Sequence, residues 1–167
     1  MSRLRRLLIS EKIFFITCNL LATRLPLEDA DFECQAMVIG GVRNRRRFLL
    51  TGYVFMPDHW HALLLPARGD TLPVLMDAFK VAAMRRIKSR RGTRGSLWQP
   101  RYFDEILWTV KQYNETVRYM HFNPVEKGWV ARREDWRWSS FHCFGGSGEI
   151  RLEIDRLELP ADENARL

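Results

Sequence analysis

Cysteine is scarce in this chain of 167 residues: Cys18, Cys34 and Cys143 are odd in number, widely separated and form no CxxC pair. This excludes a disulfide framework and a cysteine zinc knuckle, and it favours a reducing compartment. Ten glycines and seven prolines are too few for a fibrous or low-complexity chain, whereas 46% hydrophobic residues can supply a core. We therefore expect one compact domain.

Long hydrophobic runs are also missing. The arginine-rich start and apolar run at residues 3–9 resemble a signal peptide, but Glu11 and Lys12 interrupt that pattern. Residues 13–20 are too few to cross a bilayer and have the aromatic and β-branched character of a buried strand. We expect no membrane partner.

Acidic residues are absent from one long stretch. The chain has 27 Lys+Arg against 20 Asp+Glu, a formal charge of +7, and no acidic residue lies between Phe79 and Phe103. A solvated helix face explains single cations there but not the missing acids, so we expect the stretch to track DNA phosphates. Its candidate contacts are Lys80, Arg85, Arg86, Lys88, Arg90, Arg91, Arg94 and Arg101, and a second basic patch is Arg43, Arg45, Arg46 and Arg47.

Hydrophobic spacing predicts alternating helices and strands. A helix over 29–39 should end at Gly40-Gly41, and strands over 48–56 and 59–65 are apolar on both faces, which is typical of central strands. A second helix follows Thr71, with apolar spacing that continues to Ile87.

The rest of the chain adds a short strand over 102–108 and a third helix. Thr109 and Gln112 form a capping box at its start, and Pro124 should stop it near Asn123. We predict an α+β, ferredoxin-like sandwich over residues 1–148, with a mainly antiparallel sheet and helices packed on it. The tail, 149–167, has six acidic and three basic residues and should fray or pack loosely.

His59 and His61 alternate on a predicted strand, so their side chains leave the same face with Cα atoms about 7 Å apart. Two imidazoles at this spacing can bind one metal ion. The alternative is one buried, hydrogen-bonded histidine beside an exposed one. A histidine-triad hydrolase would need a third histidine at the position of Leu63.

A polar stripe runs along the third helix. Gln112, Glu115, Tyr119 and Asn123 recur at three- and four-residue intervals, apart from the apolar stripe of the same helix. Tyr119 is either an ordinary amphipathic tyrosine or a reactive one. Asn123 lies one turn further along, where its amide oxygen could complete a metal site with the two imidazoles.

Several sequence blocks, which follow one another along the chain, resemble those of a known family. They are GYVFMPDHWH (52–61), LWQPRYF (97–103), YMHFNPV (119–125), GWV (128–130) and DWRWSS (135–140). Together they resemble the REP-associated tyrosine transposases, a bacterial branch of the single-tyrosine HUH transposases with an IS200-like domain.

The resemblance implies a role for each matching residue. His59 and His61 would bind a catalytic Mg²⁺ or Mn²⁺ with Asn123 as third ligand, and Tyr119 would be the nucleophile. It also implies a substrate of single-stranded DNA with imperfect palindromic hairpins, a covalent 5′-phosphotyrosine intermediate, and a bacterial cytoplasmic, nucleoid-associated location. Two imidazoles by themselves suit Mn²⁺ or Zn²⁺ as well as Mg²⁺.

Several assignments stay open. Glu115 or His121 could take the tyrosine proton, Trp98 and Trp138 could stack unpaired bases, and Trp136 is more typical of packing. The chain could act as a monomer or a homodimer. Two rival functions are a hairpin-binding protein without cleavage and an HxH metal phosphodiesterase that uses water.

Overall fold

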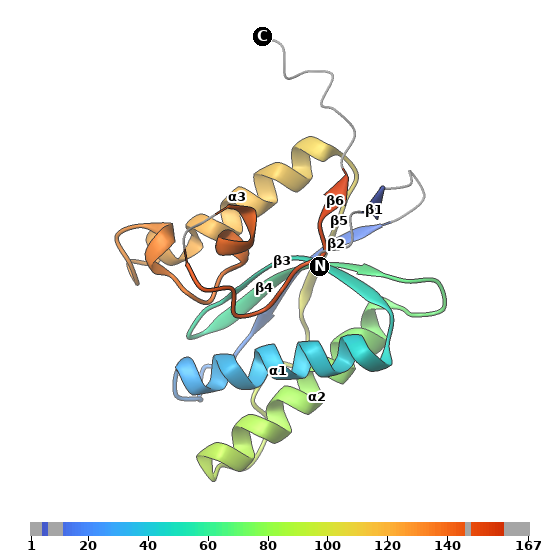
Figure 1. The fold of residues 1–167 in the computed structure, drawn as a ribbon. Coiled ribbons are helices and arrows are strands. Elements are labelled where there is room, and N and C mark those ends of the chain that lie inside the picture. The colour runs from blue at the N-terminus through green and yellow to red at the C-terminus, as the bar shows by residue number, and fades with distance from the viewer. Residues whose placement is uncertain (1–4, 7–11, 146–147, 159–167) are drawn as a thin grey trace.

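A four-stranded antiparallel sheet forms the centre of the computed structural model, which describes residues 5–6, 12–145 and 148–158. Its strand order is β3-β4-β2-β5, from β2 (Ile13–Asn19), β3 (Phe48–Phe55), β4 (His59–Pro66) and β5 (Phe103–Leu107). Helices α1 (Asp29–Arg45) and α2 (Leu72–Arg91) cover one face, and α3 (Val110–Glu126) covers the other (Figure 1). The α+β, ferredoxin-like prediction is confirmed.

Short elements follow α3. The 3-10 helices η1 (Arg133–Asp135) and η2 (Ser140–Phe144) pack near it, and β6 (Leu157–Glu158) pairs in parallel with β1 (Arg5–Arg6). No helix in the described ranges is long and apolar enough to cross a membrane.

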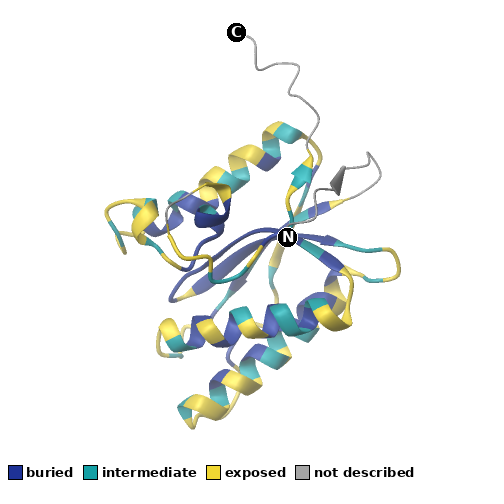
Figure 2. Ribbon diagram, viewed as in Figure 1, coloured by how far each residue is buried: buried dark blue, intermediate teal, exposed yellow. Residues whose placement is uncertain are grey.

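Strands β3 and β4 are buried on both faces and are mostly dark blue in Figure 2. Along β4, Trp60 and Leu64 pack into the core shared with α1 and α2, whereas Leu63 packs with Met120 of α3. Since side chains alternate along a strand, His61 shares the α3 face with Leu63.

Strand β3 lies at the sheet edge, so the prediction that it is central was wrong. Its outer edge is nevertheless covered by the C-terminal segment: Phe55 N donates to Trp138 O (2.9 Å), and Tyr53 N donates to Ser140 Oγ (3.0 Å). This cover explains why an edge strand carries buried side chains on both faces.

Helix α1 continues past Gly40-Gly41 to Arg45, which corrects its predicted end. Neither glycine has a positive φ, and Val42, 2% exposed, extends the buried stripe by one more turn. Burial of this side chain outweighs the modest helix cost of glycine.

Helix α3 passes through Pro124 and ends at Glu126, so the predicted stop at Asn123 was also wrong. Pro124 lies in the last turn, and the chain leaves the helix through Gly128, whose φ of 71° only glycine adopts readily. Lys127 N donates to Asn123 O and Trp129 N donates to Pro124 O, which satisfies two terminal carbonyls.

The start of the acidic tail is packed, contrary to the prediction for 149–167. Ile154 is buried, and Asp155 accepts from Leu50 N (3.0 Å) and from Arg43 Nη2 (2.7 Å). Residues 159–167 lie outside the described part of the chain.

Candidate active site

The two histidines of β4 face each other. Their Nε2 atoms are 3.1 Å apart, while Asp58 Oδ1 lies 2.6 Å from His59 Nδ1 and Thr17 Oγ1 lies 2.8 Å from His61 Nδ1. When each Nδ1–H donates to its oxygen, both Nε2 lone pairs point into the same space. Such lone pairs repel unless a cation lies between them, and oxygen partners on Nδ1 are usual for metal-binding histidines.

His61 is 3% exposed. Burial, and next the neighbouring His59, lower the pKa of His61 to about 3. Its imidazole is therefore neutral at any cellular pH, which is the form that binds a metal ion.

Tyr119 of α3 lies beside this pair. Its ring centroid is 5.6 Å from that of His61 and 6.2 Å from that of Phe15, and the residue is 44% exposed. The phenol thus borders the histidines and still faces solvent, where a substrate phosphate can reach it.

Contacts at the start of α3 and at Met120 hold the helix that carries Tyr119 against the sheet. The Thr109–Gln112 capping box starts the helix, and Tyr113 Oη donates to Thr51 O of β3 (3.2 Å). Met120 packs so closely on Gly52 that a Cβ there would lie 2.9 Å from Met120 Cε. The lack of a side chain at Gly52 lets this helix approach the sheet.

Asn123 lies one turn beyond Tyr119. It is 2% exposed, and its Oδ1 has no hydrogen-bond partner among the described residues. An unpaired buried amide oxygen is costly, which points to a missing ligand. Within the described ranges no three His, Cys, Asp or Glu side chains gather as a metal site. The residues here that could contribute to holding a divalent cation are the two histidines, through Nε2, and Asn123, through its amide oxygen.

No hydrogen bond between described residues joins Tyr119 to either suggested proton acceptor. His121 Nε2 lies 3.0 Å from Ser140 Oγ, and Glu115 Oε1 lies 4.0 Å from Lys111 Nζ. His121 belongs to another flank of α3, where it lines an open groove of about 460 Å³ with Asn114, Val117, Arg118, Phe122, Arg133, Phe141 and Phe144.

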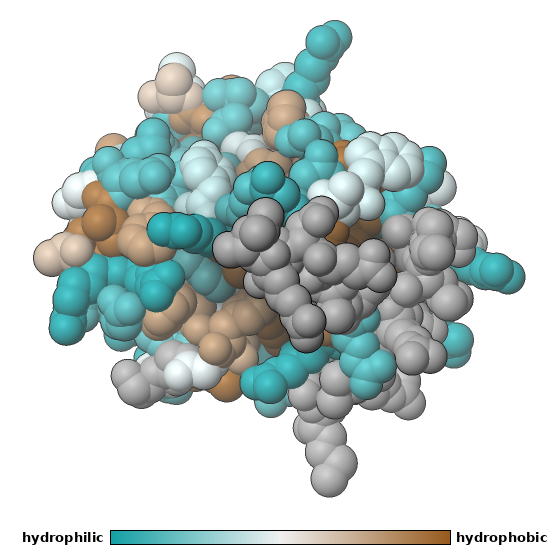
Figure 3. Space-filling model, turned by 90° about the horizontal axis from the view of Figure 1, so that it is seen from above, coloured by the Kyte–Doolittle hydropathy of each residue, from teal (hydrophilic) through white to brown (hydrophobic). Residues whose placement is uncertain are grey.

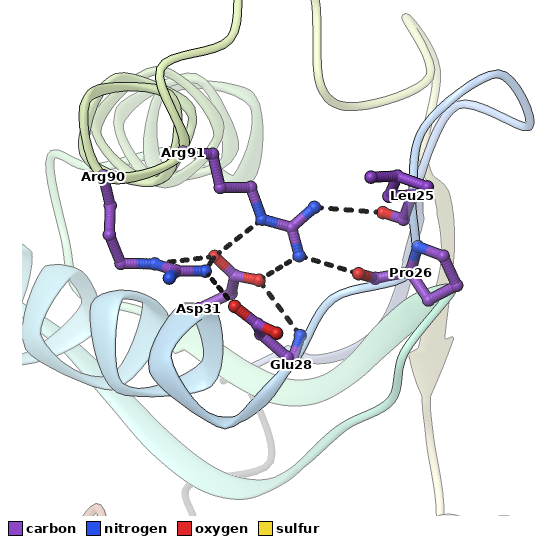
Figure 4. A network of polar contacts seen from close by, with 6 residues as sticks. All are labelled: Leu25, Pro26, Glu28, Asp31, Arg90 and Arg91. Atoms are coloured by element: carbon purple, nitrogen blue, oxygen red, sulfur yellow. Dashed lines mark hydrogen bonds and ion pairs between the residues drawn. The ribbon is translucent and has the colours of Figure 1, made fainter.

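The basic stretch of α2 lies across the sheet from the histidines, and two of its arginines bind carboxylates. Arg90 Nη2 lies 2.7 Å from Asp31 Oδ1 and from Glu28 Oε1, and Arg91 also pairs with Asp31 (Figure 4). Arg91 Nη2 further donates to Pro26 O (2.7 Å). These two guanidinium groups join α1 to α2, which argues against their predicted role in DNA binding.

Some of the other predicted phosphate contacts are also bonded to groups of the protein, and the rest form no ion pair. Arg43 pairs with Asp155, Arg46 pairs with Asp70, and Lys80 Nζ donates to two backbone carbonyls. Arg86 Nη2 donates to Met37 Sδ (3.4 Å). No ion pair with another described residue occupies Arg45, Arg47, Arg85, Lys88, Arg94 or Arg101, which leaves them available for phosphates.

The three tryptophans considered in the sequence, Trp98, Trp136 and Trp138, are packing residues. Trp98 is 3% exposed, so its predicted stacking on DNA bases is not supported. Trp138, 1% exposed, donates from Nε1 to Asp29 Oδ1, and Trp136 Nε1 donates to Phe55 O.

Sequence reasoning missed four residues around the site: Phe15, Thr17, Asp58 and Phe103. Thr17 pairs with both His61 and Phe103 across the sheet, and Phe15 stacks on the His61 ring at 5.1 Å. Asp58 could have been found because it precedes His59, but the others depend on strand register.

Comparisons with known proteins found related chains. A family model described as "Transposase IS200 like" matches residues 27–123. The chain is 32% identical over 146 residues to a REP-associated tyrosine transposase of Escherichia coli K12, which covers 85% of this chain and 84% of that protein. It is 31% identical over 120 residues to a protein of Haemophilus influenzae assigned to the same group, which covers 60% of this chain and 68% of that protein.

Solved structures extend the likeness. A REP-associated tyrosine transposase bound to a REP hairpin superimposes with a TM-score of 0.71 and 28% identity over 93% of each chain. A Deinococcus radiodurans protein described as a transposase shares the fold, with a TM-score of 0.52 and 19% identity over 71% of this chain and 95% of its own.

Proposed function

We propose, because this chain belongs to the REP-associated tyrosine transposases of the IS200-like family, that it cuts and rejoins single-stranded DNA carrying REP-type hairpins. The observation that carries this proposal is the meeting of Tyr119 with the histidine pair, at 5.6 Å between the rings of Tyr119 and His61. The hairpin-bound relative supports hairpin DNA as the partner.

Tyr119 is the nucleophile in this proposal. Its oxygen forms a bond to the scissile phosphorus as the bond from phosphorus to the 3′ oxygen breaks, and the phenol proton ends on the departing 3′ hydroxyl. One phosphodiester is exchanged for another, so the free 3′ hydroxyl can reverse the reaction and join strands. This balance suits strand transfer better than degradation.

His59, His61 and Asn123 would hold Mg²⁺ or Mn²⁺. The bound ion would neutralise charge on the phosphate oxygens in the transition state. Asp58 and Thr17 orient the two imidazoles through their Nδ1 atoms, and Tyr119 is presented from the opposite side by α3.

A denaturing gel tests the proposal. The protein is mixed with Mn²⁺ and a labelled hairpin oligonucleotide, and a DNA-linked protein band should appear. Tyr119→Phe should abolish the band because the attacking oxygen is gone. Tyr53→Phe is the control, since it removes a phenol hydroxyl in the core on the opposite face of the sheet that has no hydrogen-bond partner among the described residues, and it should keep the band.

The other outcomes separate the rival functions. If the band persists in Tyr119→Phe, Tyr119 is not the nucleophile. Cleavage without any band favours a phosphodiesterase that uses water, and hairpin binding without cleavage favours a non-catalytic binding protein.

A further inference from the structure

An exposed aromatic ring lies beside the candidate active site without a role in the mechanism. Phe103, in edge strand β5, is 54% exposed. It lies opposite Thr17 in the register, so it points to the same sheet face as His61. A single exposed ring is ordinary on a protein surface, so it is the position of Phe103 beside Tyr119 and the histidines, rather than its exposure, that points to a ligand.

Phe15 connects Phe103 to the candidate active site. The ring centroids of Phe15 and Phe103 are 6.3 Å apart, and Phe15 also contacts His61 at 5.1 Å and Tyr119 at 6.2 Å. The exposed ring is therefore one side chain removed from both the nucleophile and the proposed metal ligands. Hydrophobic and hydrophilic surface alternate on the α3 side of the molecule (Figure 3).

We infer that Phe103 forms a stacking subsite for the nucleobase next to the scissile phosphate. A strand whose phosphate reaches Tyr119 can place an adjacent base on this ring, since one phenylalanine ring separates the two side chains. Every base has a flat π-face, so the subsite holds the strand without requiring a particular sequence. Arg101, two residues earlier, is exposed and forms no ion pair with the described residues, which adds positive charge for the next phosphate.

A nucleobase explains this surface better than a protein partner. The apolar area is a single exposed ring, one side chain removed from Tyr119 and too small to bind a protein. The exposed Arg101 precedes it, and the exposed Asp104 and Glu105 follow it in β5. Phe103 is thus a positioning residue, and this role rests on the proposed cleavage of single-stranded DNA.

The test pairs protein variants with abasic oligonucleotides. Abasic sites are placed one at a time on either side of the cleaved bond, and kcat/KM for formation of the covalent band is measured. One adjacent abasic site should lower the wild-type value about 10-fold, in line with loss of one stacked base. Phe103→Ala should cause the same loss on intact DNA and no further loss at that abasic position.

Two controls separate stacking from folding. Phe103→Trp should retain kcat/KM, and Trp108→Ala should not change it, because Trp108 is exposed at the other end of the same strand. An unchanged kcat/KM for Phe103→Ala, or losses that multiply at every abasic position, would overturn the inference.

A binding measurement keeps this test independent of cleavage. A fluorescent base analogue next to the scissile bond should be quenched when the Tyr119→Phe variant binds, and adding Phe103→Ala should remove the quenching. Absence of a covalent band in the wild type refutes the proposed function, whereas quenching that survives Phe103→Ala refutes only the stacking subsite.

Discussion

The charged cluster on one face of the sheet and the histidine pair on the other differ in how their side chains are paired. On the α1 and α2 face, Asp31 is fully buried and accepts hydrogen bonds from Arg90, from Arg91 and from the Glu28 backbone. On the α3 face, the Nε2 atoms of the histidines point at each other and Asn123 Oδ1 has no partner among the described residues. The paired charges of the first cluster join α1 to α2, whereas the two imidazoles and Asn123 Oδ1 keep acceptor atoms free for a ligand.

The same contrast holds for the aromatic rings. Trp60, Trp98 and Trp138 are closed inside the core on the α1 and α2 face, whereas Tyr119 and Phe103 are half exposed on the α3 face. Mutations on the first face should therefore change stability, and mutations on the second should change chemistry.

The largest expected effect is on the α3 face. His61→Ala should lower cleavage by at least about 10³-fold, because it removes a ligand of the ion that offsets transition-state charge. Hairpin affinity should change little, since the imidazole is 3% exposed. Gel cleavage and binding assays on the same preparation check both; full activity at saturating Mn²⁺ would contradict the metal site.

Asp31→Asn should act on the other face. The change leaves Arg91 without a countercharge and Arg90 with Glu28 alone, so the free energy of unfolding should fall by about 3 kcal/mol. Urea denaturation measures this decrease, and cleavage by the folded fraction should remain. Glu28→Gln is the matched control: its side chain is 63% exposed, and it should cost less than about 1 kcal/mol. Equal decreases in the free energy of unfolding for Asp31→Asn and Glu28→Gln would contradict the larger role of the buried carboxylate.

Thr17→Val sharpens the comparison within the α3 face. The variant removes the hydroxyl at His61 Nδ1 and should raise the Mn²⁺ concentration for half-maximal cleavage about 10- to 100-fold. Saturating metal should restore the rate. Thr116→Val, which removes a hydroxyl bonded to Gln112 O within α3, should leave the metal requirement unchanged.

The smallest expected effect concerns the basic side chains outside the ion pairs. Replacing Arg85 and Arg86 together by Ala should reduce the slope of log K against log salt by about 0.7 to 0.9 for each phosphate that the protein no longer neutralises. Arg46→Ala, whose guanidinium pairs with Asp70, should change the slope less. An identical slope in the wild type and the double variant would place the DNA elsewhere.

Local patterns predicted the elements, and the errors lay where tertiary contacts compete with them. Gly40-Gly41 and Pro124 are reasonable stop signals, but burial of Val42 and the exit through Gly128 moved both helix ends. The edge position of β3 could not be predicted, because its cover comes from residues 138–140, more than eighty positions later in the chain.

The sequence by itself determined the order of elements, the alternation that turns both histidines to one face, and the helical stripe that joins Tyr119 to Asn123. These follow from backbone periods that hold for any chain. Only the tertiary structure decided that this stripe meets the histidines, that Phe103 lies beside them, and that Arg90 and Arg91 are held by Asp31. Such contacts join residues distant in the chain, and their geometry depends on strand register and helix packing, which local spacing does not encode.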